Sequence, residues 1–124
     1  DGFVVKRAVF QPCLELYPLK QWNDLMKKVG QLNQFNRKNN DFIRRFTAGV
    51  RVLELDATGR LNIPSDLMGI ASLDKHIVCR LLLDIVEIWN AAQYEKAISD
   101  AANDFADLAE EVMGQNNSMA DELS

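Results

Sequence analysis

The chain has 124 residues, of which 48% are apolar and 26% are charged, and its formal net charge is −4. This length and composition are typical of an ordinary soluble globular protein of one domain, or of two very small ones. The longest apolar run, residues 77–83, is far too short to span a bilayer, and we expect no signal peptide because no basic segment with an apolar core begins the chain.

The first third of the chain predicts a β-hairpin followed by two helices. Apolar residues at alternate positions indicate strands, with Cys13, Glu15 and Tyr17 on one face of the second strand. Apolar residues three and four positions apart indicate the helices. In chain order we expect a strand over residues 3–5, a turn at Gln11 and Pro12, a strand over residues 13–17, a helix over residues 19–29 that Gly30 ends, a loop over residues 31–40, and a helix that Asn39 or Asn40 caps and Gly49 closes.

The middle of the chain predicts a second hairpin with a tight turn. Asp56 and Gly59 supply the chemistry of a sharp reversal, because an Asp side chain can bind nearby backbone groups and Gly tolerates a positive φ. The apolar runs on either side, residues 50–55 and 61–63, have the period of strands. Arg60 leaves this turn where its guanidinium can point away from the core.

The remainder predicts a short helix, a third hairpin and a long helix. Pro64 ends the preceding strand because it cannot donate to a ladder. We expect a helix over residues 65–70, strands over residues 76–83 and 86–89 with a turn at Asp84, a helix from Asn90 to Gly114, and a disordered tail. The last helix has apolar positions at Tyr94, Ala97, Ile98, Ala101, Phe105, Leu108 and Val112, and acidic positions at Asp100, Asp104, Asp107 and Glu111.

The net charge conceals an uneven distribution. Residues 1–60 carry 11 Lys and Arg against 6 Asp and Glu, a net of +5, whereas residues 61–124 carry 3 against 12, a net of −9. An acidic total argues weakly against nucleic acid, but a phosphate backbone responds to the local patch. A basic surface therefore remains available for DNA.

The residue types of catalytic and metal sites give little support to an enzyme. Cys13 and Cys79 fit neither a metal nor a redox spacing, and we expect both to be buried free thiols in a reducing cytoplasm. His76 is the single histidine, and no Gly-rich phosphate loop is present. Glu15 and Glu87 suggest a carboxylate pair, but each alternates with apolar neighbours on a strand, so a cross-strand or cap partner is the favoured interpretation. We predict no enzyme activity, cofactor, metal or small-molecule substrate.

The two halves of the chain repeat at an offset of 72 residues over their second strands. Each copy has a strand, a turn, a strand that ends in an aromatic residue, and a helix with an aromatic residue five positions later. The matching positions are Val5, Leu14, Glu15, Leu16, Tyr17 and Trp22 in the first copy and Ile77, Val86, Glu87, Ile88, Trp89 and Tyr94 in the second. Only the second copy is preceded by a tight-turn hairpin, so we expect the chain to lack the start of its parent protein.

These motifs resemble the MraZ family of bacterial transcriptional regulators, which is built from two AbrB-like units in tandem. The family's D-x-x-G-R-[IL]-x-I-P motif is matched by Asp56, Gly59, Arg60, Leu61, Ile63 and Pro64. Its I-E-I-W motif is matched by Val86, Glu87, Ile88 and Trp89, and the alanine-leucine step before it by Ala71 and Leu73. The first unit's F-V-V, L-x-L-Y-P and W are matched by Phe3, Val4, Val5, Leu14, Leu16, Tyr17, Pro18 and Trp22.

The resemblance implies an α+β fold with a small β-barrel of the double-split, AbrB-like kind and flanking helices. It implies residues 1–49 as the remainder of a truncated first unit with a linker helix, residues 50–113 as a complete second unit, and residues 114–124 as a disordered tail. It also implies a ring-forming homo-oligomer in the cytoplasm, associated with the nucleoid, that binds promoter repeats of the cell-division and cell-wall operon and has no membrane partner.

Within this resemblance the principal DNA contact is Arg60, because an arginine at a hairpin tip can bind a guanine edge or a phosphate. Thr58 and Arg51 are secondary candidates, and Asp56, Gly59 and Pro64 shape the turn. The structural alternative for Arg60 is a salt bridge to Asp56 or to a neighbouring acid. The functional alternative is an assembly module without direct DNA contact, in which another chain covers the apolar last helix and the open sheet edges.

Overall fold

The computed structural model describes the backbone of residues 2–123 and the side chains of residues 2–100 and 104–114. The chain separates into two compact units, Asp1–Ala91 and Ala92–Ser124. The elements, in chain order, are β1 (Gly2–Arg7), β2 (Leu14–Pro18), α1 (Leu19–Val29), α2 (Arg37–Phe46), β3 (Arg51–Glu54), α3 (Ser65–Ile70), β4 (Ile77–Leu82), β5 (Ile85–Asn90) and α4 (Ala91–Leu123).

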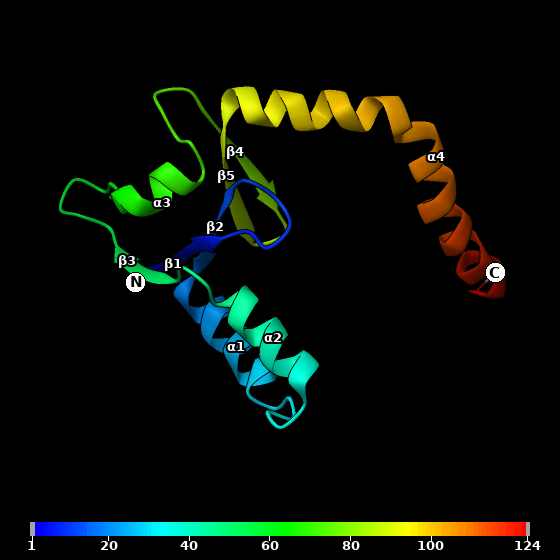
Figure 1. Cartoon of the computed structure of the whole chain (residues 1–124), viewed down its shortest axis with the longest axis horizontal. Helices are drawn as coiled ribbons and strands as arrows, with labels where there is room; N and C mark the ends of the chain where they lie inside the picture. The colour runs from blue at the N-terminus through cyan, green and yellow to red at the C-terminus, as the bar shows by residue number, and fades with distance from the viewer. Residues whose placement is uncertain (1, 124) are drawn as a thin grey trace. The chain divides into compact units, whose positions relative to one another are not determined.

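The strands form one antiparallel sheet in the order β3-β1-β2-β5-β4, flanked by helices (Figure 1). This arrangement confirms the predicted α+β class and agrees with the small β fold that the resemblance implied. Strand β3 follows two helices in sequence and returns to pair with β1, where Phe3 lies opposite Leu53. The strand that leads into the predicted turn is thereby anchored to the first hairpin.

The two faces of the sheet bury separate hydrophobic clusters, because successive side chains of a strand point to opposite faces. Val5 and Leu14 pack on one face with Leu67 of α3. Val4 and Tyr17 pack on the other face with Trp22 of α1. The Trp22 ring lies 5.2 Å from the Tyr17 ring and 5.7 Å from the Phe46 ring of α2, centroid to centroid, so α1 and α2 are locked side by side on this face.

The internal repeat appears as two hairpins, β1–β2 and β4–β5, joined through their inner strands. Glu15 of β2 lies directly opposite Glu87 of β5, which confirms the predicted equivalence of the two strands. The predicted match of Val5 with Ile77 is wrong. Val5 lies opposite Leu16, and the residue opposite Ile88 is Cys79. Val5 and Leu16 are eleven positions apart in the chain, whereas Cys79 and Ile88 are nine apart, and this difference of two shifts the outer strand.

Three predicted element boundaries are wrong. Residues 61–63 are not a strand: they do not pair with β3, which forms the edge of the sheet beside β1, and Ile63 packs against the core instead. Helix α2 begins at Arg37, because the side chain of Asn36 accepts hydrogen bonds from the N–H groups of Lys38 and Asn39. Helix α4 continues past Gly114 to Leu123, since one Gly inside a helix costs only about 1 kcal/mol.

The predictions for the two cysteines are half right. Cys13 is buried and Cys79 is exposed. Cys79 lies on β4, an edge strand with five of its six residues exposed. The assignment of units to residues 1–49, 50–113 and 114–124 stays a prediction.

Candidate functional site

The turn at residues 56–60 is built around the side chain of Asp56. One carboxylate oxygen, Oδ1, accepts hydrogen bonds from the N–H groups of Thr58 and Arg60, both at 2.9 Å, and from the Thr58 hydroxyl at 2.7 Å. The main chain closes the same loop, because the N–H of Asp56 donates to the carbonyl of Arg60 at 2.9 Å and the N–H of Gly59 donates to the carbonyl of Asp56 at 3.0 Å. The turn is therefore ordered by local bonds.

Gly59 has a φ of +80°, a conformation that side-chain-bearing residues rarely adopt. No atom lies within 4 Å of the place where a Cβ would be. The requirement for glycine at this position is thus one of backbone conformation and not of space. The sequence-based prediction that Asp56 and Gly59 shape a tight reversal agrees with this geometry.

The same hydrogen bonds keep Asp56 ionised. The backbone N–H of Arg60, the Thr58 hydroxyl and the backbone N–H of Thr58 together hold the pKa of the Asp56 carboxyl below its ordinary value. The bonds therefore reinforce the charged form at neutral pH, and this form is the one that accepts all three donors.

Arg60 is exposed, and its backbone is held at both ends by Asp56. None of the four ion pairs among the described side chains includes its guanidinium. The alternative of a salt bridge to Asp56 is thus not what ties the turn together, because Asp56 binds the main chain of Arg60. The guanidinium of Arg60 is therefore exposed to solvent on a backbone that is fixed in place.

The other predicted contact residues are engaged within the protein. The Thr58 hydroxyl donates its proton to Asp56, so contact with a phosphate would require this bond to break. The guanidinium of Arg51 forms an ion pair with Asp66 of α3 at 3.1 Å and donates to the carbonyl of Val50 at 3.1 Å. Pro64 precedes α3, and its carbonyl accepts the N–H of Met68 at 3.0 Å. These contacts fix the base of the turn to α3.

A second cluster of charges crosses the middle of the sheet. Lys6, Glu15, Glu87 and Arg80 lie in one row on four adjacent strands. The Nζ of Lys6 is 3.0 Å from Glu15, and a guanidinium nitrogen of Arg80 is 3.1 Å from Glu87. The cross-strand interpretation of the two glutamates is thus confirmed. Sequence reasoning missed Lys6, whose only signal was a cation at an inward position of an apolar strand.

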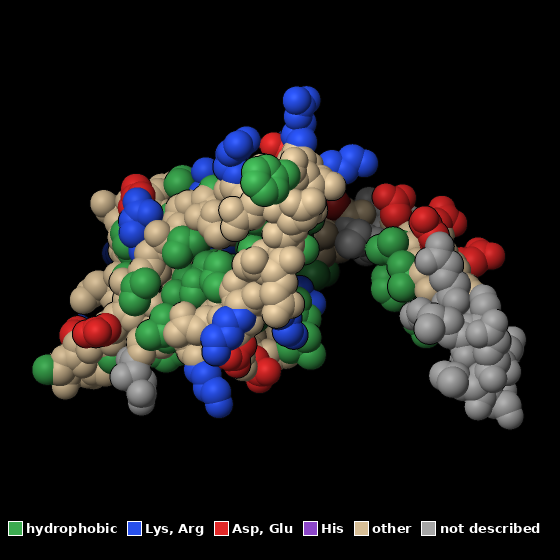
Figure 2. Space-filling view, turned by 90° about the horizontal axis from the view of Figure 1, so that it is seen from below, with side chains coloured by type: hydrophobic (Ala, Val, Ile, Leu, Met, Phe, Trp, Pro, Cys, Tyr) green, Lys and Arg blue, Asp and Glu red, His purple; other side chains and the backbone are tan. Residues whose placement is uncertain are grey.

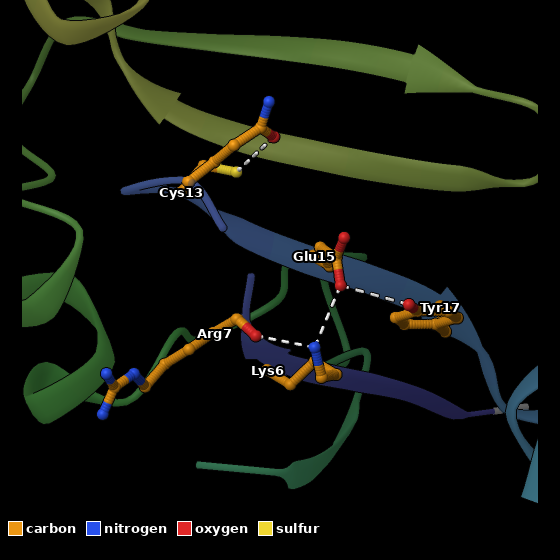
Figure 3. A network of polar contacts seen from close by, with 6 residues as sticks. Lys6, Arg7, Cys13, Glu15 and Tyr17 are labelled. Atoms are coloured by element: carbon orange, nitrogen blue, oxygen red, sulfur yellow. Dashed lines mark hydrogen bonds and ion pairs between the residues drawn. The ribbon is translucent and has the colours of Figure 1, made fainter. Parts of the chain in front are cut away.

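Aromatic donors complete this row. The hydroxyl of Tyr17 donates to Glu15 at 3.1 Å (Figure 3), and the indole N–H of Trp89 donates to Glu87 at 3.1 Å. Lys6 also donates to the carbonyl of Arg7 at 2.6 Å and lies 4.6 Å from the centre of the Phe46 ring. No buried side-chain N or O atom among the described residues lacks a partner, so this cluster is a satisfied structural network.

The charges of this network also affect the pKa of the buried thiol of Cys13. Burial, followed by the charges of Glu87 and Glu15, raises the pKa of Cys13 to about 12. Burial and the contact with Glu15 raise the pKa of Tyr17 as well. Both groups therefore stay protonated at physiological pH, and Cys13 has none of the features of a reactive cysteine.

The described residues contain no group of three or more His, Cys, Asp and Glu side chains that could hold a metal ion. Within the same part of the chain, none of the helices combines the length and apolar character needed to cross a membrane.

Comparison with known proteins gives a consistent result. The family described as "MraZ protein, putative antitoxin-like" matches residues 46–116. A transcriptional regulator MraZ from Christiangramia forsetii is 60% identical over 117 residues, which cover 94% of this chain and 76% of the relative. The protein of the same name from Flavobacterium psychrophilum is 62% identical, with 94% and 74% covered, and that from Cytophaga hutchinsonii is 37% identical, with 90% and 74% covered.

Proposed function

The chain belongs to the MraZ family, and from this premise we propose that it is a transcriptional regulator that binds double-stranded DNA through the turn at residues 56–60. The observation that carries the proposal is Arg60, an exposed cation on a backbone that Asp56 holds in place. Because the backbone of Arg60 is already fixed, binding has to order only its side chain, and the point from which the side chain reaches the DNA is defined.

Arginine suits this role because its planar guanidinium can form two hydrogen bonds to the O6 and N7 atoms of guanine, or to a phosphate. The turn projects from a base that β1 and α3 hold through β3 and the Arg51–Asp66 ion pair. Arg51 and Thr58 serve as secondary contacts, and each exchanges an internal partner for a phosphate oxygen. Of the three residues, Arg60 is thus the one whose side chain has to break the fewest internal contacts in order to bind DNA.

The distribution of charge supports the same surface. Residues 1–91 carry 13 Lys and Arg against 10 Asp and Glu, whereas residues 92–124 carry 1 against 8. The unit that bears the turn therefore has a net charge of +3, and the acidic residues that set the total are concentrated in the other unit. This separation permits an acidic protein to approach a phosphate backbone.

The finer parts of the proposal are the target and the assembly. We propose that the protein forms a ring-shaped homo-oligomer whose copies present Arg60 to successive repeats in the promoter of the cell-division and cell-wall operon. Linked copies bind with an increased effective concentration, so a weak single contact suffices for a stable complex. This role places the protein in the cytoplasm, associated with the nucleoid.

A second candidate is an assembly module that makes no direct contact with DNA. The observation that favours it is apolar exposure on α4, where Phe105 is 65% and Val112 49% exposed. Edge strand β4 likewise exposes Leu81, by 71%. Surfaces of this kind mark sites of protein–protein contact.

A gel shift distinguishes the two candidates. The probe is a duplex with the proposed promoter repeats of the cell-division operon from the organism that encodes this chain, and the control is the same duplex with the repeats scrambled. We expect a shift of the repeat duplex at protein concentrations that leave the scrambled one free. No preference for the repeats would remove the proposed sequence-specific function and leave the assembly module.

A further inference from the structure

An apolar groove runs between the β1–β2 loop, residues 8–13, and helix α2. Three cavities of about 430, 350 and 210 Å³ all include Val9 and Phe10 in their lining, and two of them include Phe42. Phe10 is 94% exposed and Phe42 is 50% exposed. An aromatic side chain held this far into solvent on a structured loop is costly unless a partner covers it.

The groove is bordered by cations that have no anionic partner among the described side chains. Lys38, Arg45 and Arg7 line its cavities, and none of them belongs to an ion pair of the described residues. The acidic residue at this border, Asp41, is 3.3 Å from Arg44. The groove therefore suits an occupant with an apolar stripe and acidic residues beside it.

Helix α4 has this chemistry. Its hydrophobic and acidic side chains lie on different sides of the helix (Figure 2). The apolar positions Phe105, Leu108 and Val112 are each at least 49% exposed. Each is preceded by an acid, the acids being Asp104, Asp107 and Glu111. Because successive helical residues differ by about 100°, these acids form a stripe along one flank of the apolar one.

The groove and the apolar stripe of α4 are different surfaces of the chain. A contact in which the groove of one copy binds α4 of another is therefore heterologous, the kind of contact that generates rings. A second copy of this chain thus fits both the chemistry of the groove and the proposed ring.

We propose that the middle part of α4, residues 104–113, binds the groove of a second copy of this chain. Phe105 and Leu108 pack against Phe10 and Phe42, and the acidic flank pairs with Lys38 and Arg45. This contact rests on the self-association in the proposed function and gives it a defined interface. It uses the groove beside α2, whose lining includes no residue of the turn that carries Arg60.

Charge reversal tests the contact in the intact chain. The variants are Lys38→Glu with Arg45→Glu, Asp104→Lys with Asp107→Lys, and all four changes together, with Lys28→Glu on α1 as a matched control outside the groove. The mass of each is measured by light scattering after size exclusion, and circular dichroism verifies folding.

We expect each double variant to shift toward the monomer mass, the fourfold variant to regain the mass of the unmodified chain, and Lys28→Glu to match it throughout. If both double variants retain the oligomer, or the fourfold variant fails to regain it, the groove is not the site. Dissociation by the α4 changes alone would indicate pairing of two α4 helices and overturn the proposal. If the unmodified chain is monomeric at every concentration, both this contact and the proposed ring are wrong. The gel shift tests DNA binding separately.

Discussion

Glu15 and Glu87 lie directly opposite each other where the two hairpins join, and each is bound by a cation from its own hairpin. Like charges at opposed positions destabilise a sheet, so the pairing depends on Lys6 and Arg80. The same arrangement is repeated on both sides of the junction, down to an aromatic donor two residues after each glutamate. The internal repeat of the sequence thus has a physical counterpart at the centre of the fold.

The first prediction concerns Lys6, whose side chain is 1% exposed. Replacing Lys6 by Met removes the cation but leaves Glu15 beside Glu87, so we expect a loss of about 3–5 kcal/mol in the free energy of unfolding. Urea denaturation measures this loss. The control is Arg44→Ala, which removes an ion pair whose partners are more than half exposed and should change stability by less than about 0.5 kcal/mol. Equal effects of the two substitutions would refute the role of the row.

The second prediction concerns the pH dependence of the turn. Because hydrogen bonds lower the pKa of Asp56 in the folded state, its carboxylate stabilises the turn above the ordinary value of 3.8 and loses this contribution as the pH falls through the folded pKa. The amide resonances of Thr58 and Arg60 should therefore shift together, with a midpoint below 3.8. In Asp56→Asn, which retains an acceptor oxygen, this titration should vanish. A midpoint at or above 3.8 would contradict the assigned bonds.

The third prediction separates backbone conformation from space at Gly59. Alanine there has room but must adopt a positive φ, so we expect Gly59→Ala to destabilise the protein by about 1 kcal/mol and to weaken DNA binding. Gly69 of α3 also has no atom within 4 Å of an added Cβ, but its backbone is helical. Gly69→Ala should therefore stabilise by about 0.5–1 kcal/mol. Thermal unfolding compares the two, and a common sign would contradict the argument.

The fourth prediction concerns the thiols. Cys79 is exposed, whereas Cys13 is buried with its pKa raised to about 12. At pH 8 a thiol reagent should therefore modify Cys79 in the folded protein and reach Cys13 only after denaturation. Mass spectrometry of the labelled peptides identifies the site. Rapid modification of Cys13 in the folded chain would show that its environment is more open than the structure describes.

The features that sequence predicted correctly depend on local chemistry. The bonds of the Asp56 turn join residues at most four positions apart, and residue types alone encode them. The alternation of Leu14, Glu15 and Leu16 fixed the faces of β2 in the same way. These patterns require no knowledge of distant parts of the chain.

The features that could not be predicted from the sequence depend either on contacts between residues far apart in the chain or on a choice between several residues of the same type. Residues 61–63 alternate like a strand, but alternation does not distinguish pairing with a strand from packing of Ile63 against the core, which is what the structure contains. Arg51 binds Asp66, fifteen positions later, which no local pattern reveals. The start of α2 was misplaced because several asparagines precede it, and only Asn36 caps it.

The salt dependence of DNA binding, measured with Arg60 replaced, tests directly whether this arginine contacts the DNA. Fluorescence anisotropy measures the affinity for the promoter repeats between about 50 and 200 mM KCl for the unmodified chain, Arg60→Ala and the control Arg44→Ala. We expect weaker binding by Arg60→Ala, with the slope of log affinity against log salt reduced by about 1 for each bound copy, and an unchanged slope for the control. An Arg60→Ala protein with the affinity and salt slope of the unmodified chain would contradict this expectation.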